Sequence, residues 1–170
     1  MLLDMSNVTS LVGVDEVPED VRSLITLGDP DYVDLFTITT TGADDRTPEE
    51  WARAALEQAP LAERNARRLW RLLGLRLGAP GAVGHVQGWR IAGRGGDWIR
   101  LETASWYMSG QAVCLVRDDQ ASISLSLRFD HRRVARAVWS LVAGPHQRAV
   151  PTMLRQAATL LFPTPPATLA

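Results

Sequence analysis

Residues 121–129 read Ala121-Ser122-Ile123-Ser124-Leu125-Ser126-Leu127-Arg128-Phe129, and they alternate without exception between apolar and polar side chains. Successive side chains of a β-strand point to opposite faces, so this segment predicts a strand with one buried face and one wet face. Such alternation is typical of an antiparallel sheet that packs on a core with one side only.

Four more strands are predicted from β-branched and aromatic content, at residues 32–41, 86–92, 98–108 and 111–117. Short turn sequences join the last four strands into a meander: Gly93-Arg94-Gly95-Gly96, Ser109-Gly110 and Asp118-Asp119. The meander is therefore expected to be one antiparallel sheet.

Helices are predicted on both sides of the meander. Thr47-Pro48-Glu49-Glu50 is a capping box with proline in the first turn, so a helix begins there, and Pro60 separates it from a second helix over residues 61–77. After the sheet, apolar residues recur every three or four positions from Val134 to Leu161. Pro145 and Pro151 interrupt this repeat, and because proline removes a helical hydrogen bond we expect a broken C-terminal helix.

These elements predict an α+β fold: an antiparallel sheet packed on a broken C-terminal helix, with two helices inserted after the first strand. The 170 residues suit one domain. We place it at residues 17–162, after a flexible segment 1–16 and before a disordered, proline-rich tail 163–170.

The turns predict which residues share the inner face of the sheet, because directly opposed residues in a hairpin lie on one face. A turn at Asp118-Asp119 pairs Cys114 with Ile123, and a turn at Ser109-Gly110 pairs Tyr107 with Ala112. The face so derived is mostly apolar, with hydroxyl groups set into it, which is typical of a ligand pocket. The alternative is that backbone groups satisfy these hydroxyls and the C-terminal helices fill the space. The candidate ligand-binding residues are Arg90, Leu101, Thr103, Ser105, Tyr107, Cys114, Ile123, Leu125, Leu127 and Phe129.

The order of elements resembles the START-like superfamily, also called SRPBCC or helix-grip. Within it, four short segments are similar to a largely actinobacterial domain family of unknown function: Asp31-Tyr32-Val33-Asp34-Leu35-Phe36, Trp51-Ala52-Arg53, Gly88-Trp89-Arg90 and Pro145-His146-Gln147-Arg148. The resemblance covers roughly residues 17–162 and brings no catalytic residues with it. It implies a helix-grip fold with about seven strands, of which the sequence patterns place five.

Charge is distributed unevenly along the chain. Residues 1–45 hold ten acidic residues and one arginine, whereas residues 46–170 hold seventeen arginines and nine acidic residues, and lysine is absent. The arginine-rich helix at 64–76 suggests either a nucleic-acid or lipid surface or simply a solvated face, and we favour the solvated face, with no specific nucleic-acid binding. The lone cysteine and the absence of long apolar runs predict a cytoplasmic protein without a transmembrane segment.

No motif assigns a reaction. The three histidines and Cys114 lack metal-ligand spacing, so neither a metal nor another cofactor is expected, and the catalytic residues are left unassigned. We consider three functions. The first is a module that binds an apolar small molecule, lipid or polyketide-like, between the sheet and the C-terminal helices. The second is an enzyme like a polyketide cyclase or dehydratase, with Tyr107, Arg90 or a nearby histidine carrying the proton. The third is an interaction domain that forms a homodimer through outward-facing Trp89, Trp98 and Trp106.

Overall fold

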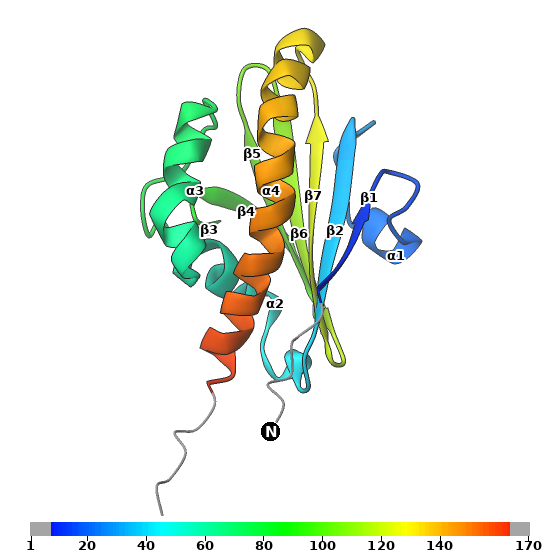
Figure 1. Cartoon of the computed structure of the whole chain (residues 1–170), viewed down its shortest axis with the longest axis vertical. Coiled ribbons are helices and arrows are strands. Elements are labelled where there is room, and N and C mark those ends of the chain that lie inside the picture. Colours follow the sequence, from blue (N-terminus) through cyan, green and yellow to red (C-terminus); the bar gives the residue numbers. More distant parts are fainter. Residues whose placement is uncertain (1–7, 164–170) are drawn as a thin grey trace, which may run out of the picture.

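Seven antiparallel strands form one sheet in the computed structural model, which describes residues 8–163 (Figure 1). The spatial order is β1-β2-β7-β6-β5-β4-β3. The strands are β1 (Val8–Val12), β2 (Tyr32–Thr39), β3 (His85–Val86), β4 (Trp89–Arg94), β5 (Trp98–Ala104), β6 (Ser109–Arg117) and β7 (Gln120–Arg128). The helical elements are α1 (Glu19–Arg22), the 3₁₀ turn η1 (Ala43–Asp45), α2 (Pro48–Arg53), the π-helical turn η2 (Ala54–Gln58), α3 (Pro60–Leu72) and α4 (Arg132–Leu161).

The predicted α+β class and antiparallel meander are confirmed, and two strands are added to the five expected. Residues 85–86 form a separate short strand, and residues 8–12 form β1, which pairs with β2 along its whole length. Residues 8–12 of the predicted flexible segment 1–16 therefore form a strand. Residues 1–7 and most of the predicted tail, 164–170, lie outside the described residues.

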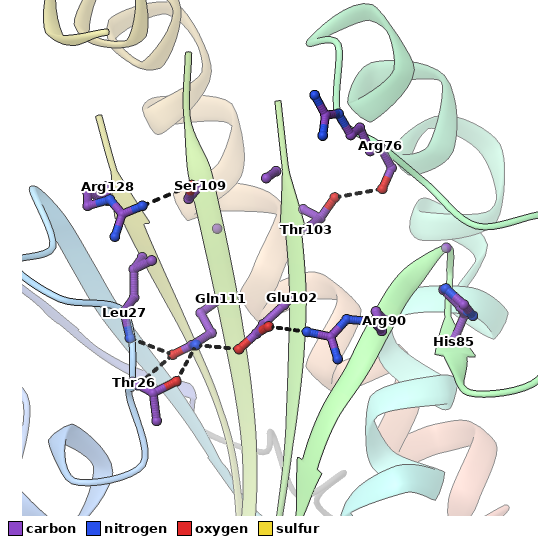
Figure 2. Close-up of a pocket in the computed structure, with 13 residues that line it drawn as sticks. Thr26, Leu27, Arg76, His85, Arg90, Glu102, Thr103, Ser109, Gln111 and Arg128 are labelled. Carbon is purple, nitrogen blue, oxygen red and sulfur yellow. Dashed lines mark hydrogen bonds and ion pairs between the residues drawn. The ribbon is translucent and has the colours of Figure 1, made fainter. Parts of the chain in front are cut away.

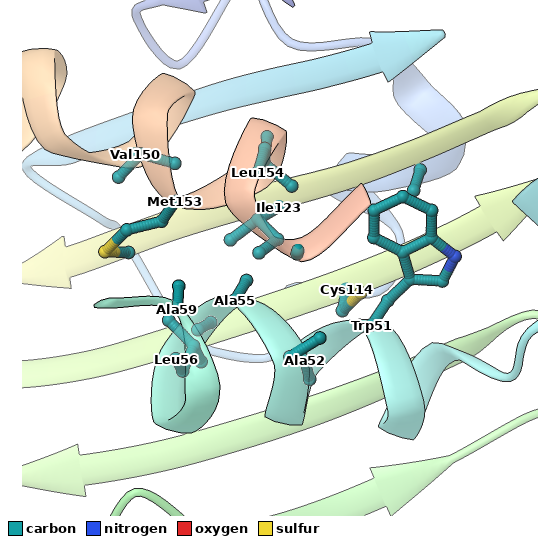
Figure 3. Packing of buried hydrophobic residues seen from close by; sticks show 14 of the residues in the cluster. Trp51, Ala52, Ala55, Leu56, Ala59, Cys114, Ile123, Val150, Met153 and Leu154 are labelled. Atoms are coloured by element: carbon teal, nitrogen blue, oxygen red, sulfur yellow. The ribbon is translucent and has the colours of Figure 1, made fainter. Parts of the chain in front are cut away.

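The main core lies between the sheet and the helices α2 and α4 (Figure 3). Trp51 of α2 is fully buried, and its indole nitrogen donates a hydrogen bond of 2.9 Å to the carbonyl oxygen of Ala43. The neighbouring alanines Ala52, Ala55 and Ala59 are also fully buried. Their small side chains let this part of the chain pack closely on the sheet, which is why a short helix can cover it.

Helix α4 runs from Arg132 to Leu161 and contains both prolines, so the predicted break in the C-terminal helix is wrong. Proline removes one backbone donor and crowds the preceding turn, at a cost of about 3 kcal/mol in a helix interior. Buried residues lie on both sides of the prolines, among them Ala135 before them and Leu154 after them. Packing of one continuous helix face on the sheet offsets the local cost.

The second face of the sheet is covered by the chain between β1 and β2. Val17 and Val21 pack against Leu35 and Leu115 in a small separate core. The prediction that the serine face of β7 is wet is therefore wrong: Ser122, Ser124 and Ser126 are all buried. The acidic N-terminal segment thus belongs to the fold rather than standing apart from it.

The predicted pairing of β6 with β7 is confirmed, since Cys114 lies opposite Ile123. The pairing of β5 with β6 is wrong, because Leu101 rather than Tyr107 opposes Ala112. The chain turns at residues 105–108 and not at Ser109-Gly110, which already belong to β6. From Tyr107 to Leu101 the register moves by an even number of positions, so the face assigned to β5 is still right.

A β-bulge in β4 reverses the faces predicted for the first strand of the meander. The register between β4 and β5 shifts between Ile91 and Gly93, where one extra residue is inserted. Arg90 consequently pairs with Glu102 on the outer face, and Trp89 turns inward, where it is 5% exposed. The predicted inward Arg90 and outward Trp89 are both wrong for this reason.

Candidate functional site

A cavity of about 360 Å³ lies between the inner face of the sheet and the helices α3 and α4. Its wall is apolar almost throughout. From the sheet side and the 105–108 turn the lining residues are Trp89, Thr103, Met108, Gly110, Ala112, Ile123, Leu125 and Leu127. From the helical side they are Leu56, Leu61, Ala62, Ala66, Leu69, Trp70, Leu73, Leu75, Trp139, Val142, Pro145, His146, Ala149, Val150 and Met153.

Small residues on β6 leave the space that the cavity occupies. Gly110 and Ala112 are its lining residues on this strand, so no large side chain projects there. A Cβ atom at Gly110 would lie 3.4 Å from the ring of Trp89, which shows that the indole packs directly over this glycine. The ring of Trp70 on α3 meets Trp89 edge to face at 5.4 Å, and both residues line the cavity.

Four of the ten predicted ligand-binding residues line the cavity: Thr103, Ile123, Leu125 and Leu127. Leu101 and Cys114 share the inner face but lie within the main core, where burial raises the pKa of the Cys114 thiol to about 12. Phe129 packs at the end of the sheet in a smaller cluster beside Ala135. Arg90 lies on the outer face, as described above.

The three hydroxyl groups that motivated the predicted pocket are bound to backbone groups. Thr103 donates to the carbonyl oxygen of Arg76 at 3.1 Å, and Tyr107 donates to that of Leu73 at 2.6 Å. Ser105 donates to the carbonyl oxygen of Met108 at 3.3 Å within the 105–108 turn. The alternative weighed from the sequence, that backbone groups satisfy these hydroxyls, is the one observed.

The second polar side chain of the cavity wall is His146, which pairs with a buried carboxylate, that of Asp34. Asp34 of β2 lies on the inner face, opposite Leu125, and is 1% exposed. The Nε2 atom of His146 on α4 lies 2.7 Å from Oδ2 of Asp34. The hydroxyl of Tyr32 donates to the same oxygen at 2.7 Å, and the backbone N–H of Leu125 donates to Oδ1 at 2.9 Å.

These contacts define which atoms of the group donate and which accept hydrogen bonds. The Tyr32 hydroxyl donates to one oxygen of Asp34 and the Leu125 backbone N–H donates to the other, so both carboxyl oxygens act as acceptors. Burial raises the pKa of Tyr32, and the negative charge of Asp34 raises it further, so the tyrosine keeps its proton and donates it. His146 must then carry its proton on Nε2.

Aromatic rings hold the imidazole of His146 in place. The ring of Trp139 lies 5.4 Å from it and that of Phe36 lies 6.1 Å from it. Gln147 donates a hydrogen bond of 3.2 Å to the hydroxyl of Tyr32, which links the next residue of α4 to the same group. Two of the segments that carried the family resemblance, residues 31–36 and 145–148, thus meet at this point.

Asp34 was not among the predicted site residues, although the sequence carried a signal for it. The inner-face positions of β2 are Tyr32, Asp34, Phe36 and Ile38, so an acidic residue interrupts an otherwise apolar alternation. A charge at a core-facing strand position requires a partner. Its partner, His146, lies 112 residues later in the chain, a distance over which the sequence pattern gives no pairing.

Comparison with protein-family models and with curated proteins finds no match to this chain. A solved structure from Pseudomonas aeruginosa, titled a protein of unknown function and putative regulator, is similar at 12% identity. The alignment covers 82% of each chain with a TM-score of 0.27.

A second hollow, of about 480 Å³, lies on the outer face of the sheet and is polar (Figure 2). Gln111 is central to it: its carbonyl oxygen accepts from the backbone N–H groups of Thr26 and Leu27, and its nitrogen donates to Glu102. Glu102 in turn pairs with Arg90 at 2.6 Å. These groups satisfy one another and fasten the segment after α1 to the sheet, which is a structural role.

The described part of the chain contains neither a cluster of potential metal ligands nor a helix that could span a bilayer. Between residues 8 and 163, no three His, Cys, Asp or Glu side chains gather as a metal ion would need. Within the same range, none of the helices combines the length and apolar character that a bilayer crossing requires.

Proposed function

We propose that this protein is a binding module for an apolar small molecule, lipid or polyketide-like, held between the sheet and the helices α3 and α4. The observation that carries the proposal is the apolar cavity of about 360 Å³ with His146 in its wall. Natural ligand pockets have volumes of about 300–1,000 Å³, apolar linings and few polar groups. An apolar cavity of roughly 150 Å³ already binds benzene, so this one has room for a larger molecule.

The test is binding of N-phenylnaphthylamine, an apolar dye whose fluorescence rises on burial, followed by displacement with fatty acids and aromatic polyketides. Leu125→Trp places a large ring in the cavity wall and should abolish dye binding. Leu141→Trp is the matched control, because Leu141 lies on α4 but is 78% exposed, and it should bind like the wild type. Equal binding by all three proteins, or by none, would refute the proposal.

A second candidate is an enzyme like a polyketide cyclase or dehydratase. Of the proton carriers considered from the sequence, Arg90 is on the outer face and the Tyr107 hydroxyl is bound to Leu73, which leaves His146. A histidine held by a carboxylate is the usual arrangement of a general base. Uptake of deuterium by an apolar ketone in heavy water, faster with the wild type than with His146→Phe, would support this candidate.

We do not propose the homodimer, because two of its three tryptophans pack against the hydrophobic cores. Trp89 is buried in the core, and Trp98 packs beside the cluster that includes Val17 and Leu35. Trp106 alone is largely exposed, at 62%. A single exposed aromatic side chain is not an extended apolar patch.

A further inference from the structure

We propose that the ligand carries a hydroxyl group, alcoholic or phenolic. The hydroxyl donates a hydrogen bond to His146, which Asp34 holds in the accepting tautomer. This inference rests on the proposed function, since it places the polar end of the apolar ligand at one point of the cavity wall. It adds the chemical class of the ligand and the residues that select it.

The first step is the tautomer of His146. Asp34 accepts from Tyr32, from His146 and from the backbone of Leu125, so its two oxygens are occupied by donors. The proton of a neutral imidazole is therefore on Nε2, and Nδ1 carries a free lone pair. Asp34 in this way makes Nδ1 an acceptor.

The second step is the position of that acceptor. His146 lines the cavity, and in the described part of the chain its ring makes no hydrogen bond other than the one from Nε2 to Asp34. Thr103, a second polar side chain in the wall, already donates to the backbone of Arg76. The Thr103 oxygen retains lone pairs, so it and the imidazole of His146 are the two acceptors that polar side chains of this wall offer a ligand.

The third step is the burial of the pair. Asp34 is 1% exposed and the His146 side chain is 19% exposed, so a partner bound there is shielded from water. A site built to bind a hydroxyl discriminates against analogues that lack it, because its buried polar group is then left without a partner. The cavity should therefore select hydroxylated apolar molecules over plain hydrocarbons.

The experiment uses three probes of similar shape on the full chain: naphthalene, β-naphthol and the methyl ether of β-naphthol. The ether keeps the oxygen but has no proton to donate. The wild type should bind β-naphthol about fivefold more tightly than the ether, the effect of one net hydrogen bond. His146→Phe should abolish this preference and retain naphthalene binding, which also reports that the variant is folded.

Asp34→Asn provides a second, independent variant. An asparagine amide donates to Nε2, so the histidine proton moves to Nδ1 and the acceptor becomes a donor. The variant should therefore bind β-naphthol and its methyl ether with equal affinity, although the imidazole is still present. A role of Asp34 in folding alone would leave that ratio unchanged.

The outcomes separate the two proposals. If the wild type binds naphthalene but does not distinguish β-naphthol from the ether, the hydroxyl inference is wrong and the apolar module stands. If the wild type binds none of the three probes, both are wrong. If His146→Phe or Asp34→Asn binds naphthalene and keeps the wild-type preference, the pair does not recognise the hydroxyl.

Discussion

Nε2 of His146, in the middle of helix α4, lies 2.7 Å from Oδ2 of Asp34, on the inner face of strand β2. This contact joins the helix to the sheet across the cavity wall. A buried carboxylate costs free energy unless donors surround it, and here it has three. The same contact therefore stabilises the fold and defines the polar point of the site.

Removing either partner should destabilise the protein, and the two effects should not add. Asp34→Ala leaves the donors of Tyr32, His146 and Leu125 without their acceptor, and we expect a loss of about 3 kcal/mol in the free energy of unfolding. His146→Ala should lose about 1–3 kcal/mol, and the double variant should show a coupling of about 1–2 kcal/mol. Urea denaturation of the four proteins measures this cycle, and additive losses would contradict a direct interaction.

Cys114 should resist modification in the folded protein. It is 4% exposed on the inner face, and burial raises the pKa of its thiol to about 12, so the reactive thiolate is scarce at neutral pH. A bulky disulfide reagent should label it only after unfolding in urea, which serves as the control for complete reaction. Full labelling within minutes in native buffer would show that this face opens readily.

The sequence pattern was sufficient to predict the inner face of β7 and its pairing with β6, but not the burial of its serine face. Strict alternation in residues 121–129 and a two-residue turn leave one register available. It was also sufficient to predict the start of α2, because Thr47 and Glu50 form the expected reciprocal cap. Local chemistry determines features of this kind.

Features that depend on distant contacts could not be predicted. The bulge between Ile91 and Gly93 inserts one residue without a clear turn or proline signal, and it reversed the faces of Arg90 and Trp89. The continuity of α4 through Pro145 and Pro151 depends on packing against the sheet. The partnership of Asp34 with His146 depends on the tertiary fold alone.

Stability should depend on pH through the cap of α2. The carboxylate of Glu50 accepts from the backbone N–H of Thr47 at 2.8 Å and from its hydroxyl at 2.9 Å, and these bonds lower the pKa of Glu50. A lowered pKa means that the stabilisation is complete above the unfolded-state pKa of about 4.3 and is lost as the pH falls through the folded-state pKa.

Glu50→Gln removes this titration. The wild type should therefore be more stable than the variant at pH near 7, and the difference should shrink as the pH falls below about 4. Glu63→Gln is the control, because Glu63 forms no salt bridge within residues 8–163. Thermal unfolding across the pH range measures the difference, and a constant gap between wild type and Glu50→Gln would rule out the charge of the cap as its cause.

Two serines on the outer face of β7 offer a matched comparison. Ser124 and Ser126 are both 1% exposed and lie two positions apart on one strand. Ser124 donates a hydrogen bond of 2.6 Å to the carbonyl oxygen of Asp34, whereas the hydroxyl of Ser126 has no partner among the described residues. The same substitution at the two positions therefore removes a bonded and an unbonded hydroxyl from two equally buried positions on one face of the strand.

Ser124→Ala should lower the free energy of unfolding by about 1–2 kcal/mol, because it leaves a buried carbonyl of β2 without this donor. Ser126→Ala should change it by less than about 0.5 kcal/mol or raise it, because it removes a buried hydroxyl that gains nothing in the fold. Urea denaturation of the three proteins measures these differences. The comparison is valid if the free energy of unfolding falls with urea concentration at the same slope in all three. Equal losses of unfolding free energy at both positions would mean that packing determines the effect, and not the hydrogen bond from Ser124 to the carbonyl oxygen of Asp34.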